Sequence, residues 1–282
     1  MSVVRLGTHR VEKPWGRRVL GNGFPDATGT EGPVGEIWFG MPGDANDELL
    51  VKYLFTSERL SVQVHPNDRQ ARAVGLPRGK DECWLILKAD PDACIALGPR
   101  HAIAPDRLVE AIADRSIENL LHWEPVRRGD FLFVPAGTVH AIGAGISLIE
   151  VQQNSDATYR LYDYGRPREL HVEAGIAVAS RRPFERIDGP GEVAPGRMIL
   201  VEGPTFVLER WAGNIAEIAV EPDQPGFLVP LSGAGEINAQ PWASGECFRV
   251  EGAARIQASE PADLLFAYPG RERLDTVAMI GS

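Results

Sequence analysis

The chain has little cysteine and little histidine: of its 282 residues, three are Cys and six are His. Cys83, Cys94 and Cys247 are too scattered for a disulfide framework, and none belongs to a CxxC pair. We therefore expect reduced thiols and a cytoplasmic protein. No apolar run is long enough to span a bilayer, and the first residues lack the apolar segment of a signal peptide. We expect no membrane partner.

Positive charge is also scarce. Lys and Arg number 29 against 39 Asp and Glu, which gives a net charge of −10 at pH 7. This balance leaves no basic footprint for nucleic acid or anionic lipid, so we expect neither as a partner. An anionic substrate would have to be bound by a local cluster of Lys and Arg. Oligomeric state is left open by the sequence.

Glycine and proline, by contrast, are plentiful, with 30 and 22 residues, and they indicate many turns and therefore many strands. Apolar residues recur at helical spacing over 101–122, which predicts a helical insertion there. Short apolar segments bounded by turn residues predict strands on both sides of this insertion, at 34–40, 49–55, 59–66, 82–89, 93–98, 126–134, 139–151 and 157–164.

The stretch 180–196 is rich in proline, glycine and charge and is typical of a linker. Further strand-like segments follow it at 206–213, 226–233, 247–252 and 263–269. We therefore predict a mostly β protein with a catalytic module at 1–185 and a smaller module at 190–282. No histidine follows His171, so the second module cannot repeat a histidine ligand set.

Four residues of the first module form a candidate metal site. Gln63 and His65 stand two apart in "LSVQVHPND", so they project from the same face of a strand. Glu82 opens the strand "ECWLILKA", and His140 follows the turn formed by 135–137. Two imidazoles, a carboxylate and an amide oxygen suit a borderline divalent ion such as zinc, and iron or manganese accept them too.

Several segments carry a resemblance to a known family. In "GDFLFVPAGTVHAIG" (129–143) the spacing G-x5-P-x-G-x2-H matches the second cupin motif up to its histidine. The first cupin motif is kept in part, with Gln63-x-His65 in place of HxH. Together with "GKDECW", "QNSDATYRLYDYGR", "KPWG" and "VGEIWFG", these segments resemble type I phosphomannose isomerase in its short bacterial form. The resemblance covers 10–180, with a general likeness to the metal-free second half from 190 onward.

The resemblance implies two cupin-like modules, each a β-barrel or jelly roll. It implies one zinc ion per chain, held by Gln63, His65, Glu82 and His140, with no further cofactor. It also implies catalytic roles for three charged residues, Arg160, Lys80 and Glu150. The activity it implies is the interconversion of mannose 6-phosphate and fructose 6-phosphate through an enediol, with a phosphorylated hexose as substrate.

The chemistry of aldose–ketose isomerisation agrees with these residue types. The reaction needs a base that takes a proton from one carbon and returns it to the next, and positive charge near the two oxygens. Glu150, Lys80 or a water on the metal could carry the proton, and the sequence does not choose among them. An arginine or a metal ion can stabilise the charge on the oxygens.

Two other functions stay open at this point. His65, Glu82 and His140 form a 2-His-1-carboxylate set, which could hold Fe(II) for oxygenase chemistry. Oxygen consumption would identify that activity. The chain could also be a non-catalytic sugar-binding cupin, which would bind its ligand without turnover.

Overall fold

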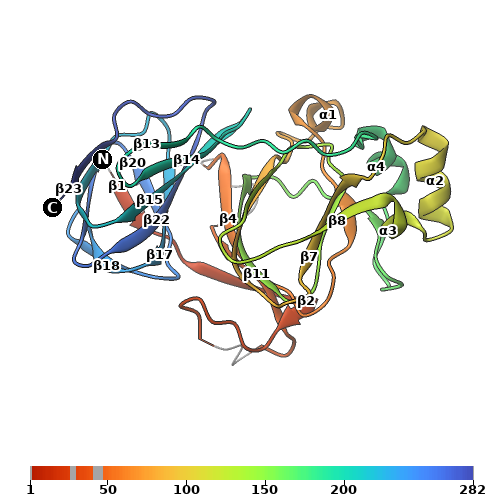
Figure 1. Cartoon of the computed structure of the whole chain (residues 1–282), viewed down its shortest axis with the longest axis horizontal. Helices are drawn as coiled ribbons and strands as arrows, with labels where there is room; N and C mark the ends of the chain where they lie inside the picture. Colours follow the sequence, from red (N-terminus) through yellow and green to blue (C-terminus); the bar gives the residue numbers. More distant parts are fainter. Residues whose placement is uncertain (1, 26–29, 41–46, 282) are drawn as a thin grey trace.

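Strands dominate the protein: of the residues that the computed structural model describes, 48% lie in strands and 10% in helices. The structure describes residues 2–25, 30–40 and 47–281. Its strands form four stacked sheets with helices against one side (Figure 1). The predicted mostly β fold is confirmed, and within the described residues each module is a pair of open sheets rather than a closed barrel.

The first module contains two sheets. The central sheet has six strands, in the order β2 (Thr8–Arg17), β3 (Val34–Phe39), β4 (Leu49–Phe55), β11 (Ile146–Gln153), β6 (Glu82–Ala89) and β9 (Phe131–Val134). The helix-side sheet has five, in the order β12 (Tyr159–Tyr162), β5 (Val62–Val64), β10 (His140–Ile142), β7 (Cys94–Pro99) and β8 (Leu121–Pro125). The segment predicted as one strand over 139–151 is two strands, because the chain turns at 143–145.

The second module also contains two sheets. The interface sheet has seven strands, in the order β1 (Ser2–Arg5), β20 (Phe248–Glu251), β17 (Gly226–Ser232), β22 (Ala262–Pro269), β15 (Phe206–Gly213), β14 (Arg197–Glu202) and β13 (Gly191–Ala194). The outer sheet has five, in the order β19 (Gln240–Ala243), β18 (Ala234–Ile237), β21 (Ala254–Ala258), β16 (Ile215–Val220) and β23 (Ala278–Gly281). The end of the predicted linker is thus ordered as β13, which pairs with β14.

Strand β1 ties the start of the chain to the second module. It pairs antiparallel with β20, with Val3 opposite Val250, and Figure 1 shows it in red among the blue strands. We propose a division in which residues 2–5 complete the interface sheet and the remaining residues up to 185 form the first module. The two modules are therefore joined at both ends of the first one.

Four helices are described: α1 (Asp68–Ala73), α2 (Pro105–Ala113), α3 (Ile117–Leu120) and α4 (Val172–Val178). The insertion predicted over 101–122 begins at Pro105, and it is two helices followed by β8 rather than one helical stretch to residue 122. The break comes at Arg115, whose φ of 65° lies in the left-handed region that an α-helix excludes. Helices α2, α3 and α4 cover the outer face of the helix-side sheet.

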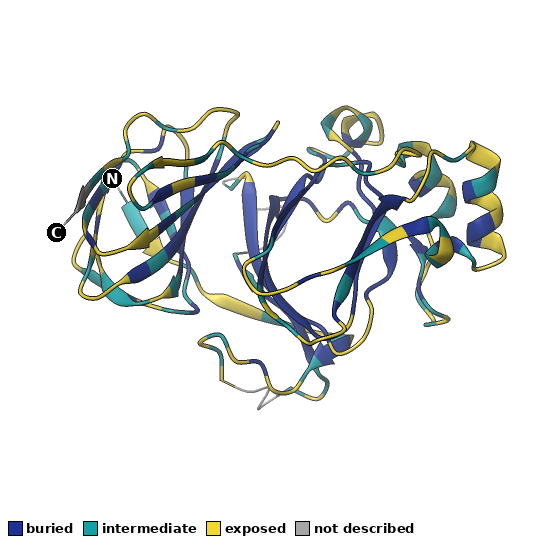
Figure 2. Cartoon of the chain, in the orientation of Figure 1, coloured by how far each residue is buried: buried dark blue, intermediate teal, exposed yellow. Residues whose placement is uncertain are grey.

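Strand alternation sorts side chains into successive layers. In β11, Ile149 and Val151 pack in the core between the central and interface sheets, while Leu148 packs between the central and helix-side sheets. Glu150 shares the face of Leu148 and therefore lies inside the first module. Figure 2 shows that the strands on both sides of this inner space are mostly buried. Three candidate site residues, His65, Glu82 and His140, lie together in this inner space.

Candidate metal centre and active site

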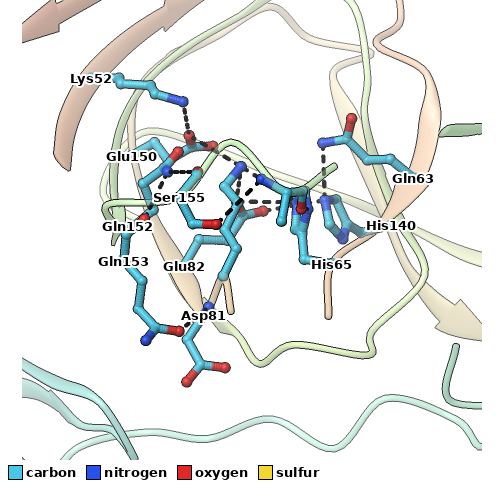
Figure 3. A network of polar contacts seen from close by, with 12 residues as sticks. Lys52, Gln63, His65, Asp81, Glu82, His140, Glu150, Gln152, Gln153 and Ser155 are labelled. Atoms are coloured by element: carbon cyan, nitrogen blue, oxygen red, sulfur yellow. Dashed lines mark hydrogen bonds and ion pairs between the residues drawn. The ribbon is translucent and has the colours of Figure 1, made fainter. Parts of the chain in front are cut away.

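Three predicted metal ligands meet between the two sheets of the first module. His65 follows β5, Glu82 begins β6 and His140 begins β10, and their ligand atoms all lie within 4.8 Å of one another. His65 Nε2 is 3.4 Å from Glu82 Oε2, and His140 Nε2 is 3.2 Å from Glu82 Oε1. All three side chains are buried. The structure thus brings together, from opposite sheets, the residues that the sequence places far apart (Figure 3).

Backbone carbonyls set the tautomers of both histidines. His65 Nδ1 lies 2.9 Å from the carbonyl oxygen of Ala157, and His140 Nδ1 lies 2.9 Å from that of Thr138. A carbonyl only accepts, so each Nδ1 carries a hydrogen and donates it. The two Nε2 atoms then carry no hydrogen and turn their lone pairs into the cluster, near Glu82. This is the arrangement of metal-binding histidines, whose second nitrogen is commonly held by a backbone or carboxylate oxygen.

The protonation states of these three side chains also favour metal binding. Burial and the nearby Lys80 ammonium lower the pKa of His65 to about 4, although Glu82 opposes them. Burial also lowers the pKa of His140. For Glu82, burial alone would raise the pKa, but Lys80 and the two histidines bring it well below its usual range. At neutral pH the set is two neutral imidazoles and one carboxylate, the forms that bind a metal.

The surroundings of Glu82 are suited to a cation. No described donor is aligned for a hydrogen bond to either of its carboxylate oxygens, which are fully buried. The ammonium of Lys80 is 2.9 Å from Glu82 Oε2, 3.4 Å from His65 Nε2 and 3.9 Å from Glu150 Oε1. The cluster therefore already attracts one positive charge, and its donor atoms fit a divalent ion of the zinc type.

Lys80 and Glu150, both predicted as catalytic, lie beside this cluster. Glu150 Oε1 is 3.3 Å from Lys52 Nζ, and Glu150 Oε2 accepts a hydrogen bond of 3.3 Å from Trp84 Nε1. Burial alone would lower the pKa of Lys80, but Glu82 and Glu150 raise it. Lys80 is therefore an ammonium at neutral pH. It can donate hydrogen bonds and stabilise negative charge, while Glu150 offers a carboxylate.

Gln63 is also at the cluster. It lies opposite His140 across the β5–β10 pair, with its Nε2 3.2 Å from His140 Nε2. Its Oε1 accepts a hydrogen bond of 3.2 Å from Ser61 Oγ. The inward orientation expected for Gln63 and His65 is confirmed, since Val62 and Val64 pack on the helix side. In this structure the amide nitrogen of Gln63, not its oxygen, faces His140.

Arg160 lies on the same inner face of the helix-side sheet as Gln63. It is opposite Gln63 in the β12–β5 pair, while the next residue, Leu161, packs against the helices. Its Nη1 donates to the carbonyl oxygen of Glu169 at 2.8 Å, and its Nε is buried without a partner among the described residues. Its backbone is held by His171, whose Nδ1 accepts from Arg160 N at 3.3 Å. No contact of its guanidinium with the described His65–Glu82–His140 cluster is present.

Two buried residues of the site were missed by the sequence reasoning. Lys52 sits in the middle of β4, 8% exposed, and contacts both Glu150 and the ring of Trp38, 5.1 Å from its centroid. Gln152, opposite Glu82 in the β11–β6 pair, is fully buried. A lysine inside the apolar segment "LLVKYLF" was a usable signal, because lysine is almost never buried without a partner. Gln152 gave no such signal.

These features define a class of protein: a cupin-like β protein of two sheet pairs, with a buried His–Glu–His centre in the first. Comparison with known proteins agrees. The chain is 36% identical over 214 residues to a mannose-6-phosphate isomerase of Streptococcus mutans, covering 71% of this chain and 65% of the relative. It thus spans slightly less than two thirds of that relative's length. No family model matches the chain.

Solved structures of mannose 6-phosphate isomerases have a similar fold. The mannose 6-phosphate isomerase of Bacillus subtilis is 27% identical, with a TM-score of 0.82 over 95% of this chain and 100% of that one. A zinc-bound mannose 6-phosphate isomerase, 16% identical, shares the fold with a TM-score of 0.72 over 95% of this chain and 100% of that one. In sequence and in fold the chain is therefore similar to mannose-6-phosphate isomerases. Among its described helices, none has the length and apolar character needed to cross a membrane.

Proposed function

We propose that the protein is a zinc-dependent isomerase that interconverts mannose 6-phosphate and fructose 6-phosphate. The observation that carries this proposal is the joint placement of a metal-type cluster, His65, Glu82 and His140, with an ammonium and a carboxylate at its edge. A sugar-binding protein has no use for that acid–base pair. The names of the relatives support the same substrate and reaction.

We propose zinc as the bound metal, because this donor set suits it. His65, Glu82 and His140 would hold it, with Gln63 beside His140 as the fourth candidate, one ion per chain. Two imidazole nitrogens and a carboxylate oxygen are common zinc ligands in catalytic sites. When bound, the ion would supply positive charge that polarises the sugar's carbonyl oxygen.

The residues beside the cluster carry out the proton transfer. In the open-chain aldose, Glu150 takes the C2 proton, and the electrons of that C–H bond form the C1=C2 bond of the enediol as O1 gains a proton. Protonated Glu150 then gives this proton to C1, with the electrons of the C1=C2 bond forming the new C–H bond, while the O2 hydroxyl passes its proton to Lys80, which had protonated O1, and the C2=O2 ketone forms. Lys80 carries its proton at neutral pH and so stabilises negative charge on these oxygens.

We assign to an arginine the contacts with negatively charged oxygens of the substrate. We propose Arg160 as a catalytic residue on the inner face beside Gln63, where its guanidinium can form bidentate contacts with oxygens. We also propose a cytoplasmic location, supported by three free cysteines of which Cys83 and Cys247 are buried. The second module, 190–282 with the added β1, is proposed to be structural and free of metal.

A coupled assay on mannose 6-phosphate tests the whole proposal. Activity should be lost after exhaustive chelation and restored by one equivalent of zinc. His140→Ala should abolish both metal binding and turnover, and the exposed His122 provides a matched control in His122→Ala. A chelated protein that isomerises at the untreated rate would contradict the proposal. Oxygen consumption with Fe(II), without isomerisation, would favour an oxygenase instead.

A further inference from the structure

The turn 135–138 connects the three metal-type residues through its backbone. Gly137 N donates to the carbonyl oxygen of His65 at 2.8 Å. The carbonyl oxygen of Thr138 accepts the Nδ1 hydrogen of His140 at 2.9 Å. Ala136 N donates to Oδ1 of Asp81, the residue before Glu82, at 2.8 Å. One short turn thus contacts His65, His140 and the residue before Glu82, which places it where it can influence the positions of all three ligands.

Asp81 joins this turn to the second module. Its Oδ2 accepts a hydrogen bond of 2.9 Å from Oγ1 of Thr205. Its own backbone is clamped by Gln153, whose Oε1 accepts from Asp81 N and whose N donates to the Asp81 carbonyl oxygen, both at 3.0 Å. Asp81 is 6% exposed, so solvent competes little for these bonds. Figure 3 shows Asp81 and Gln153 together at one end of the polar network.

Thr205 is itself held firmly. It occupies the connection between β14 and β15, immediately before Phe206, which is fully buried. The Phe206 ring packs edge-on against Phe133 of the central sheet, with centroids 5.7 Å apart. The carbonyl oxygen of Thr205 accepts from Gly270 N at 3.1 Å. The hydroxyl that reaches Asp81 therefore projects from a short connection that is held by the packing of Phe206 and by the hydrogen bond from Gly270.

We propose that Thr205 is a positioning residue for the metal centre, acting through Asp81 on the turn 135–138. The second module would then set the geometry of a site to which it contributes no ligand. Groups that orient metal ligands without touching the metal commonly change metal affinity by about 10- to 100-fold. The proposal deepens the proposed function, since the centre it concerns is the proposed zinc site, but metal retention measures it without any turnover.

The test compares three substitutions in the full-length zinc-loaded protein. Thr205→Val removes the hydroxyl and keeps the shape, Thr205→Ser restores the hydroxyl, and Thr276→Val removes another threonine hydroxyl of the second module. Thr276 Oγ1 donates to the carbonyl oxygen of Glu221 at 3.0 Å, and it is exposed. The primary measurement is the rate at which zinc passes to an excess of a chromogenic chelator, with kcat, KM and the unfolding midpoint measured alongside.

We expect Thr205→Val to release zinc about tenfold faster and to lower kcat more than it raises KM, with Thr205→Ser and Thr276→Val close to wild type. Zinc release from Thr205→Val at the wild-type rate, or an equal change in Thr276→Val, would overturn the proposal. Failure of Thr205→Ser to restore retention would do the same. If the wild type binds zinc but does not isomerise mannose 6-phosphate, the proposed function fails while this inference is still tested by zinc release.

A double-mutant cycle tests the route through Asp81 and covers the case in which Thr205→Val folds poorly. Asp81→Ala should release zinc faster than wild type, and adding Thr205→Val to it should cause little further change. If Thr205→Val alone does not fold, the two single variants Asp81→Ala and Thr205→Ser are compared instead. Wild-type zinc retention in Asp81→Ala would then refute the proposal. Additive effects of Asp81→Ala and Thr205→Val would show that Thr205 acts by another path.

Discussion

Removing the second module should destroy the first one, although the module contributes no proposed ligand. The perturbation is a chain that ends at residue 185. The central sheet would then lose the interface sheet, which covers one of its faces in a single shared core. Strand β1 would also lose β20, the strand with which it pairs.

The size of the effect follows from the shared core. On the central-sheet side, Phe39, Val51, Tyr53, Phe55 and Phe133 are each at most 1% exposed. Burying a large apolar side chain stabilises a protein by about 1.5–3 kcal/mol, so exposing about five costs about 10 kcal/mol. A whole domain is stable by only about 5–15 kcal/mol. We therefore expect the truncated chain to aggregate or to remain unfolded.

The assay distinguishes the loss of the interface sheet, which covers the central sheet, from the loss of a residue needed for catalysis. Residues 1–185 are expressed alone and together with a fragment of residues 186–282, and soluble yield and isomerase activity are measured. The fragment should restore both, because it rebuilds the interface sheet without supplying a ligand. Phe206→Ala in the fragment should weaken the rescue, because the Phe206 ring packs against Phe133. A soluble, fully active chain of residues 1–185 alone would refute the reasoning.

Four substitutions or conditions test the site itself. His140→Ala should remain folded by circular dichroism but bind no zinc, and one equivalent of bound zinc would contradict its role. Arg160→Ala should lower kcat at least about 100-fold, whereas a kcat within about threefold of wild type, well short of a catalytic group's usual effect, would reassign it to phosphate binding. Lys52→Met should cost about 3 kcal/mol in urea unfolding by leaving Glu150 without its nearest ammonium, and adding Glu150→Gln should recover most of it. In the metal-free protein, unfolding raises the pKa of His65 from about 4 toward 6.5, so stability should fall as pH drops across that interval, and His65→Gln should flatten the profile.

Local patterns explain how much of the fold could be predicted. Alternation placed Gln63 and His65 on one face and Val62 and Val64 on the other, and the apolar run before Pro135 gave a strand followed by the turn that leads to His140. Short strands such as β18 and β19 in the second module were not predicted, because they are brief and only partly buried. Their apolar periodicity is too weak to stand out from a loop.

The missed parts of the site depend on contacts between distant segments. Lys52 meets Glu150 because β4 pairs with β11, nearly a hundred residues further along the chain, in the register that places the two residues opposite each other. Thr205 meets Asp81 because the interface sheet packs on the central one. Neither the register of strands so far apart nor the packing of two sheets is encoded in a local pattern.

Charge balance at the centre is compatible with the proposed binding of a phosphorylated sugar by an acidic protein. Glu82 is paired with Lys80 at 2.9 Å, and Glu150 with Lys52 at 3.3 Å, so these four buried groups sum to no net charge, and both nearby histidines are neutral. Buried pairs of this kind add little stability over apolar residues of similar volume, which argues that their value here is functional. A divalent ion held at the cluster would then leave the inner space positive, within a chain of net charge −10. Because the inner space has low dielectric, that local charge outweighs the distant, solvent-screened charges of the surface.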